Sequence, residues 1–179
     1  MRLSIVLSTH AAQFNAVTFK GDFEANIAKI AGWGYDGVEL AVRDPALVDA
    51  ERLAQVISAH GLAVPAIGTG QAWGEERLSF TSIEPAVRRA AVERIKSHIP
   101  LAKRFGALII IGLIRGVTPS GQSHTQSLNY LVKALVECAA EAALHGVRLA
   151  LEPINRYETD LINTVDEGLA LLERVGAIN

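Results

Sequence analysis

Four glycines in the chain each precede an extended apolar run, and this repeat restricts the fold more than any other feature. Each glycine also ends a stretch with helical periodicity, where a residue without a Cβ commonly terminates a helix. Together with an apolar segment at residues 1–7, the runs predict five strands that alternate with helices. The four pairs are Gly37 before residues 38–40, Gly61 before residues 62–67, Gly106 before residues 107–111 and Gly146 before residues 147–151.

The predicted strands are continuous apolar runs, whereas strands with one wet face alternate apolar and polar residues. Continuous runs indicate that both faces are buried, as in a parallel sheet covered by helices. Five repeats of strand and helix without a hairpin signal therefore predict the α/β class. An open doubly wound sheet and a (β/α) barrel both satisfy this pattern, and periodicity alone does not separate them.

The composition limits the functional classes. The 179 residues, half of them hydrophobic and 20% charged, predict one soluble domain. A formal net charge of −2 gives no general attraction to nucleic acid or to a lipid surface. The longest apolar run, residues 107–113, is far below the roughly 20 residues that span a bilayer. Cys138 is the single cysteine; we interpret it as a core residue and expect a reducing, cytoplasmic location.

Two helix starts carry recognisable caps. Residues 164–167 form a capping box, and we expect Leu169 and Leu172 of the helix that follows to face the core. Asp44 and Pro45 combine a capping residue with a first-turn proline. They predict the start of a helix with the apolar face Leu53, Val56 and Ile57.

Glu152, directly after the apolar run 149–151, is the strongest functional candidate. Parallel α/β folds place their chemistry at the carboxyl ends of strands. A carboxylate there can bind Mg²⁺ or Mn²⁺, and when desolvated it can remove a proton next to a carbonyl. The alternative is an ion pair with a nearby arginine. Glu39, near the end of an earlier strand, either shares the site or only supports the rim of the sheet.

Other strand-end residues are candidates for substrate binding. Gly68 opens a tight turn that lets a substrate approach the backbone; the turn lacks the spacing of a phosphate loop and a helix directly after it. Gln71 is a candidate hydroxyl ligand, and His10 follows the first strand. Arg115 could clamp a substrate carboxylate or hydroxyl, or form a surface ion pair. Arg43 and Arg115 together favour an acidic substrate over a neutral one.

Four segments resemble the xylose-isomerase-like sugar phosphate isomerases and epimerases. The resemblance runs along essentially the whole chain. It is closest to the 5-keto-L-gluconate epimerase branch, near the ketose 3-epimerases. The segments that carry it are residues 41–45, 66–72, 106–113 and 152–160, of which the last is the most specific.

This resemblance implies a TIM barrel with one divalent metal ion, for which we expect Mn²⁺ before Mg²⁺ or Co²⁺. In the family, Glu, Asp, His and Glu side chains at strand ends bind the metal, and the two glutamates form the acid/base pair. By resemblance, Glu152 is the first metal ligand and a catalytic residue, and Glu158 contacts a substrate hydroxyl. The implied reaction epimerises or isomerises a keto-sugar or keto-sugar acid through a cis-enediolate.

The remaining ligands of the family come from strands six to eight, which the sequence does not contain. A complete barrel takes roughly 250 residues. We therefore expect residues 1–179 to be the N-terminal part of a single TIM-barrel domain with five βα units, and self-association into a homo-oligomer stays open.

Two alternatives to a metal-dependent epimerase were weighed. One is a truncated, non-catalytic remnant that binds a sugar or self-associates. The other is a related barrel that cleaves DNA at abasic sites. That class holds zinc with histidines at the ends of the third and fourth strands, where Gly68 and Gly112 stand. Without those histidines or a basic groove, nucleic acid is disfavoured as a partner.

Overall fold

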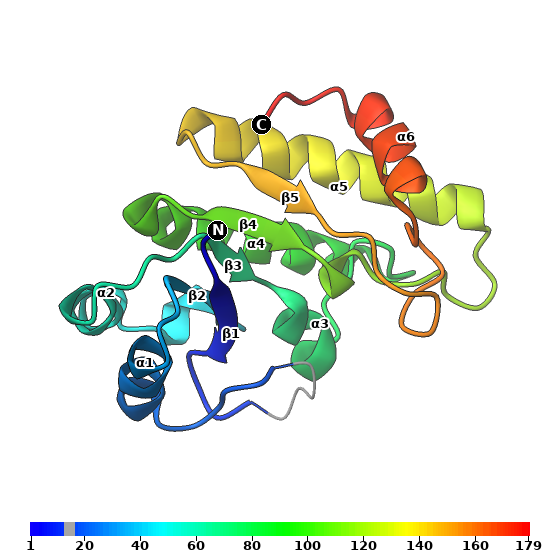
Figure 1. Cartoon of the computed structure of the whole chain (residues 1–179). Coiled ribbons are helices and arrows are strands. Elements are labelled where there is room, and N and C mark those ends of the chain that lie inside the picture. The colour runs from blue at the N-terminus through cyan, green and yellow to red at the C-terminus, as the bar shows by residue number, and fades with distance from the viewer. Residues whose placement is uncertain (13–16) are drawn as a thin grey trace.

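The computed structural model (Figure 1) describes residues 1–12 and 17–179. These residues form one sheet in which all neighbouring strands are parallel. The strands lie in the order in which they occur in the chain: β1 (Ser4–Ser8), β2 (Gly37–Ala41), β3 (Ala66–Gly68), β4 (Leu108–Ile111) and β5 (Leu149–Leu151).

The strand order separates the two architectures that periodicity left open. A doubly wound sheet reverses its order at a switch point, whereas a TIM barrel adds each strand beside the previous one. The order β1-β2-β3-β4-β5 has no reversal. The prediction of an α/β, TIM-barrel-like fold is therefore confirmed for these five strands.

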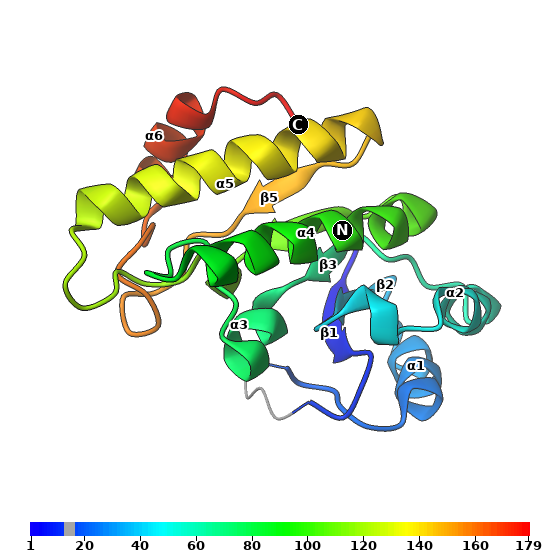
Figure 2. The ribbon, with the colours of Figure 1, turned by 180° about the vertical axis from the view of Figure 1, so that it is seen from behind.

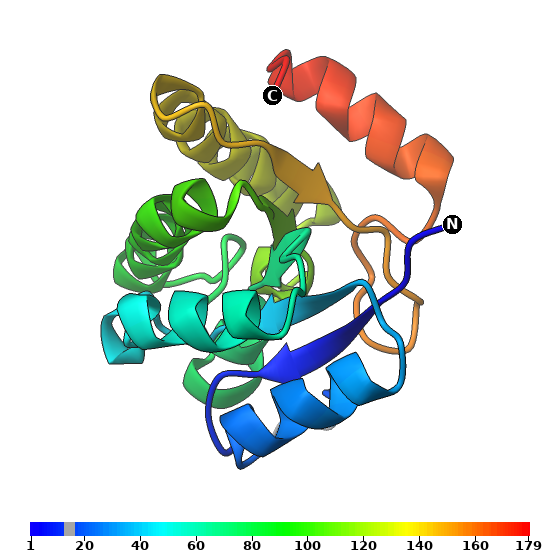
Figure 3. The same ribbon diagram turned by 60° about the vertical axis from the view of Figure 1, so that its left-hand side comes forward.

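The helices pack along the outer side of the sheet. Figure 3 shows the sheet curving from β1 to β5 with the helices around it. Figures 1 and 2 show α4 and α5 running side by side. The bounds are α1 (Phe23–Gly32), α2 (Ala50–Ala59), α3 (Gly70–Glu76), α4 (Pro85–Phe105), α5 (His124–Leu144) and α6 (Val165–Val175), with short 3-10 helices at η1 (Pro45–Leu47) and η2 (Leu113–Arg115).

The two faces of the sheet differ sharply in composition. Successive residues of a strand point to opposite faces, so the strand register assigns each residue to one face. The outer face is apolar and fully buried against the helices, with Leu7, Val38, Leu40, Ile67, Ile109 and Ile111. The inner face carries the row Ser8, Ala41, Gly68, Ile110 and Ala150, in which each residue pairs with the next across the sheet.

The prediction that both faces are buried is wrong for part of the inner face and for β5. In β4 the outer residues Ile109 and Ile111 are buried, whereas Leu108 and Ile110 are partly accessible. All of β5 is partly accessible. A continuous apolar run therefore does not require equal burial of both faces of the strand. One face packs against the helices and the other lies on the inner side of the sheet.

Two helix predictions are corrected. The pair Asp44-Pro45 opens η1, and α2 begins later with its own cap, Asp49. The capping box before α6 is confirmed, but Leu169 and Leu172 are exposed. Gly168 and Leu171 face the core instead. The buried stripe of α6 is thus shifted by one residue, and Gly168 lies beside Leu151, Pro153 and Ile162.

Cys138 is fully buried in α5, and burial raises the pKa of its thiol to about 12. The prediction of a core residue is confirmed. Among the described residues, no helix combines the length and the apolar character that crossing a bilayer requires.

A buried hydrogen-bond cluster around Gly116 joins three loops at the carboxyl side of the sheet. Thr81 Oγ1 donates to the carbonyl of Val117 at 2.7 Å, and Thr159 Oγ1 donates to that of Gly116 at 2.8 Å. Gly116 has a φ of +89°, and a Cβ there would overlap the hydroxyl oxygens of Ser79 and Thr81. This cluster holds the segment after β5 in place.

We expect Gly116→Ala to destabilise the protein more than Gly121→Ala. Both glycines have a positive φ, but nothing lies within 4 Å of a Cβ at Gly121. The unfavourable φ costs about 1–3 kcal/mol at either site, and overlap adds about 1–3 kcal/mol at Gly116 alone. Urea unfolding measures both losses, and equal losses would contradict the close packing described here.

Candidate active site

A pocket of about 480 Å³ opens on the inner face at the carboxyl ends of the strands. The strand residues that line the pocket lie at every second position along their strands. These are the residues that the strand register places on the inner face. The loops after β3 and β5 close its sides. Residues that line it include Val6, Glu39, Gly68, Gln71, Ile110, Gly112, Glu152, Asn155 and Glu158.

Glu152 reaches this pocket because Gly112, the residue that follows β4, has no side chain. The Glu152 N–H donates to the carbonyl of Ile111 at 3.1 Å, which extends the β5 ladder beyond the strand. A Cβ on Gly112 would stand only 2.6 Å from Glu152 Oε2. Gly112 therefore provides the space that the carboxylate occupies. The sequence analysis did not identify this role, which becomes visible only once the register of β4 and β5 is known.

The surroundings of Glu152 make its carboxylate a stronger base than an ordinary glutamate. Partial burial raises its pKa; the positive charge of Arg115 opposes this shift, and the negative charge of Glu158 reinforces it. A raised pKa means a higher proton affinity. Glu152 can thus accept a proton at this pocket while it remains reachable by a ligand.

Glu39 lies in the same pocket, so the possibility that it shares the site is the one the geometry supports. Burial raises the pKa of Glu39, and the charge of Glu152 raises it further. A Cβ on Gly68 would lie 3.2 Å from Glu39 Oε1. The inner face therefore carries two acidic groups that disfavour each other's ionisation.

Arg115 is fully buried, which contradicts the alternative of a surface ion pair. Its guanidinium donates to the backbone carbonyls of Leu161 at 3.0 Å, Ile162 at 3.1 Å, Ile111 and Glu152. Burial lowers its pKa to about 10, and the charge of Glu152 acts in the opposite direction. Arg115 thus fastens η2 to the backbone on both sides of the loop after β5, and its predicted contact with substrate remains a prediction.

The other predicted substrate contacts fall into two groups. Gly68, Gln71 and Glu158 line the pocket. Glu158 accepts a hydrogen bond from Asn155 Nδ2 at 3.0 Å. The expectation that no helix follows Gly68 directly is wrong, because α3 starts at Gly70. Its seven residues are too few to show a clear apolar period.

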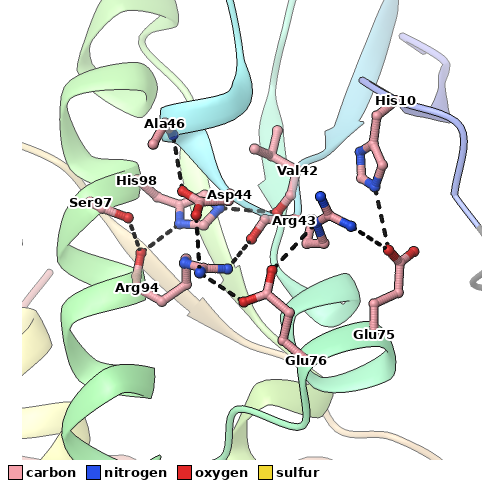
Figure 4. Close-up of polar contacts among 10 residues, drawn as sticks. All are labelled: His10, Val42, Arg43, Asp44, Ala46, Glu75, Glu76, Arg94, Ser97 and His98. Carbon is pink, nitrogen blue, oxygen red and sulfur yellow. Dashed lines mark hydrogen bonds and ion pairs between the residues drawn. The ribbon is translucent and has the colours of Figure 1, made fainter.

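Arg43 and His10 belong to an ion-pair network outside the described pocket lining (Figure 4). Arg43 pairs with Glu75 at 3.0 Å and with Glu76 at 3.3 Å, and His10 Nε2 lies 3.6 Å from Glu75. Arg94 of α4 adds a second pair to Glu76 at 2.8 Å. The network fastens α3 to neighbouring elements, and contacts of Arg43 and His10 with a substrate remain predictions.

The resemblance implies a divalent cation, so the donors around Glu152 were compared with such a site. In residues 1–12 and 17–179, no group of three or more His, Cys, Asp or Glu side chains is arranged to hold a metal ion. Glu152 supplies hard carboxylate oxygens of the type that Mg²⁺ and Mn²⁺ prefer. The described residues thus offer carboxylate oxygens of a suitable type but do not complete a metal site.

The raised pKa of Glu39 leads to a pH-dependent stability. The folded protein binds this proton more tightly than the unfolded chain, so the stabilisation is complete below the unfolded pKa of about 4.3 and is lost as the pH rises through the folded pKa. We expect Glu39→Gln to be more stable than the wild type at about pH 8, with a gain that shrinks toward about pH 4.5. Urea unfolding across this range measures the gain.

Glu173→Gln, which alters an exposed carboxylate on α6, is the matched control and should show no such trend. A gain for Glu39→Gln that stays constant with pH would contradict the assigned burial of Glu39.

Comparison with known proteins places the chain in a family of TIM barrels. The family model described as xylose isomerase-like TIM barrel matches residues 27–179. The chain is 31% identical to L-ribulose 3-epimerase of Mesorhizobium japonicum, over 97% of this chain and 58% of that protein. It is 27% identical to ketose 3-epimerase of Arthrobacter globiformis, over 92% of this chain and 58% of that protein.

Solved structures agree with this placement. A structure of L-ribulose 3-epimerase superposes with a TM-score of 0.75 at 30% identity, over 98% of this chain and 58% of the other. D-allulose 3-epimerase from Methylomonas sp., in complex with D-allulose, gives a TM-score of 0.75 at 27% identity, over 98% and 60%. The chain spans about three fifths of the length of these relatives. It belongs to the xylose isomerase-like TIM barrel family.

Proposed function

We propose that this chain carries the proton-abstracting part of a ketose epimerase site, with Glu152 as the base. The observation that carries the proposal is the placement of Glu152. Its carboxylate has a raised pKa and lies against Gly112 in a pocket at the carboxyl ends of parallel strands. Chemistry in barrels of this kind is found at that end of the strands.

Ketoses are the proposed substrate class. The relatives named above are L-ribulose and ketose 3-epimerases, and the pocket offers polar groups that suit a polyhydroxylated ligand. Gly68 leaves room for a sugar near the backbone, and Glu158 offers carboxylate oxygens to a hydroxyl. Keto-sugar acids, which the resemblance to 5-keto-L-gluconate epimerase implies, are the second class.

In the proposed reaction, Glu152 removes the proton on the carbon next to the ketose carbonyl and leaves an enediolate. The Arg115 guanidinium donates a hydrogen bond to the backbone carbonyl of Glu152, and the Asn155 amide donates one to the Glu158 carboxylate. Return of a proton to the opposite face completes an epimerisation. Exchange of the Glu152 proton with solvent makes the first step observable on its own.

A divalent cation, Mn²⁺ first and Mg²⁺ or Co²⁺ as alternatives, is proposed as the partner of Glu152. When bound, such an ion would polarise the carbonyl and the adjacent hydroxyl. Since the described residues do not complete its site, the proton transfer proposed here is assigned to Glu152 alone.

The proposal is tested by incubating the protein with L-ribulose or D-allulose in D₂O, with and without Mn²⁺, and following deuterium entry beside the carbonyl by NMR. We expect exchange with the wild type and a loss of at least about 100-fold in Glu152→Gln, because the amide cannot accept the proton. Glu173→Gln, altered far from the pocket, should exchange like the wild type.

Two results would count against the proposal. Deuterium exchange that persists in Glu152→Gln would show that Glu152 is not the base. A folded wild-type protein that binds the ketose without any exchange would favour the alternative of a non-catalytic sugar-binding protein.

Gly112→Ala tests whether the position of the Glu152 carboxylate matters. The new Cβ would displace Oε2, the mobile end of a side chain, so the fold should be retained. We expect deuterium exchange to fall by roughly 10- to 100-fold, since displacements of about 1 Å can cost that much, while the thermal unfolding temperature stays close to that of the wild type. Gly32→Ala, where a Cβ meets open space, is the control, and equal exchange in the two variants would contradict the role of Gly112.

A further inference from the structure

Two buried polar side chains at the pocket, Ser8 and Gln71, are not explained by the fold or by the proton transfer. Ser8 is fully buried and Gln71 is 1% exposed. They come from β1 and α3, 63 residues apart in the chain, and their side chains meet at 2.9 Å. Buried polar groups in proteins are nearly always satisfied, so a pair with unused hydrogen-bonding capacity requires a reason.

Of the two polar atoms of the Gln71 carboxamide, one has a hydrogen-bond partner among the described residues and the other has none. Its Nε2 donates to Ser8 Oγ, and Ser8 Oγ also accepts from the backbone N–H of His10 at 3.3 Å. Gln71 Oε1 is buried and has no hydrogen-bond partner within the described part of the chain. An unpaired buried acceptor costs about 1–3 kcal/mol, and Gln71 lines the pocket that contains Glu152.

The helix α3, which carries Gln71, is anchored at both of its ends. Thr69 Oγ1, just before α3, donates to the carbonyl of Ile110 at 2.7 Å. At the other end of α3, Glu75 and Glu76 are paired with Arg43 (Figure 4). Ser8 then fixes the orientation of the amide from the side of β1.

We propose that Gln71, oriented by Ser8, is a specificity residue that accepts a hydrogen bond from one hydroxyl group of a ketose through Oε1. This inference rests on the proposed function, because it names how the same pocket recognises its substrate. A site built to pair with a hydroxyl discriminates against an analogue that lacks it, since the buried polar group is then left unpaired. The pocket would therefore recognise a substrate hydroxyl from the wall formed by the start of α3.

The test uses D-allulose and its monodeoxy derivatives as probes, with dissociation constants measured by NMR titration. The wild type should bind D-allulose roughly tenfold more tightly than the monodeoxy derivative that lacks the hydroxyl paired with Gln71, as expected for the loss of one hydrogen bond. In Gln71→Met this preference should disappear, while preferences at the other positions persist. Gln55→Met, on the exposed side of α2, should match the wild type.

Ser8→Ala is the second variant and keeps the test decisive if Gln71→Met folds poorly. Without its anchor the amide is free to reorient, so the preference for the same hydroxyl should weaken rather than vanish. Circular dichroism confirms the fold of each variant.

The outcomes separate the two proposals. In one outcome, the wild type exchanges deuterium through Glu152 while the wild type, Gln71→Met and Ser8→Ala all show the same relative dissociation constants for the deoxy derivatives. That result would overturn the role of Gln71 and leave the proposed function standing. Such a result would mean that Oε1 is satisfied by water alone. Wild type that binds no ketose would overturn both proposals.

Discussion

The register of the parallel strands is the constraint on which the rest of the structure depends. Because adjacent residues of a strand face opposite sides, one register places apolar side chains against the helices and small or acidic ones on the inner face. The row Ser8, Ala41, Gly68 and Ile110 runs straight across the sheet. A shift of one residue in β2 would turn Glu39 from the inner face toward the helices.

Desolvation is the second physical effect on the inner face, where it raises the pKa values of two carboxyl groups. Burial raises the pKa of both Glu39 and Glu152, and the charge of Glu152 raises that of Glu39 further. Arg115 is the compensating charge, but its guanidinium is bound to backbone carbonyls behind the site. The cation thus stabilises the loop after β5 and opposes the raised pKa of Glu152 without occupying the pocket.

Local sequence patterns predicted most of the elements and the strongest site residue. The four glycines before the apolar runs, together with the apolar segment at residues 1–7, located the five described strands, and the residue type and position of Glu152 indicated a strand-end acid. Predictions failed where packing overrode the pattern. Asp44 caps a short 3-10 helix rather than α2, and α6 turns Gly168 and Leu171 inward rather than Leu169 and Leu172.

The sequence by itself determined the α/β class, the alternation of strand and helix, and the carboxylate at the end of β5, because these follow from propensities within about ten residues. Only the tertiary structure decided the barrel-like strand order, the space that Gly112 leaves for Glu152, and the contact between Ser8 and Gln71. The physical reason is distance along the chain. Strand order and register arise from pairing between residues 27 to 42 positions apart, and a local periodicity carries no information about which segments meet.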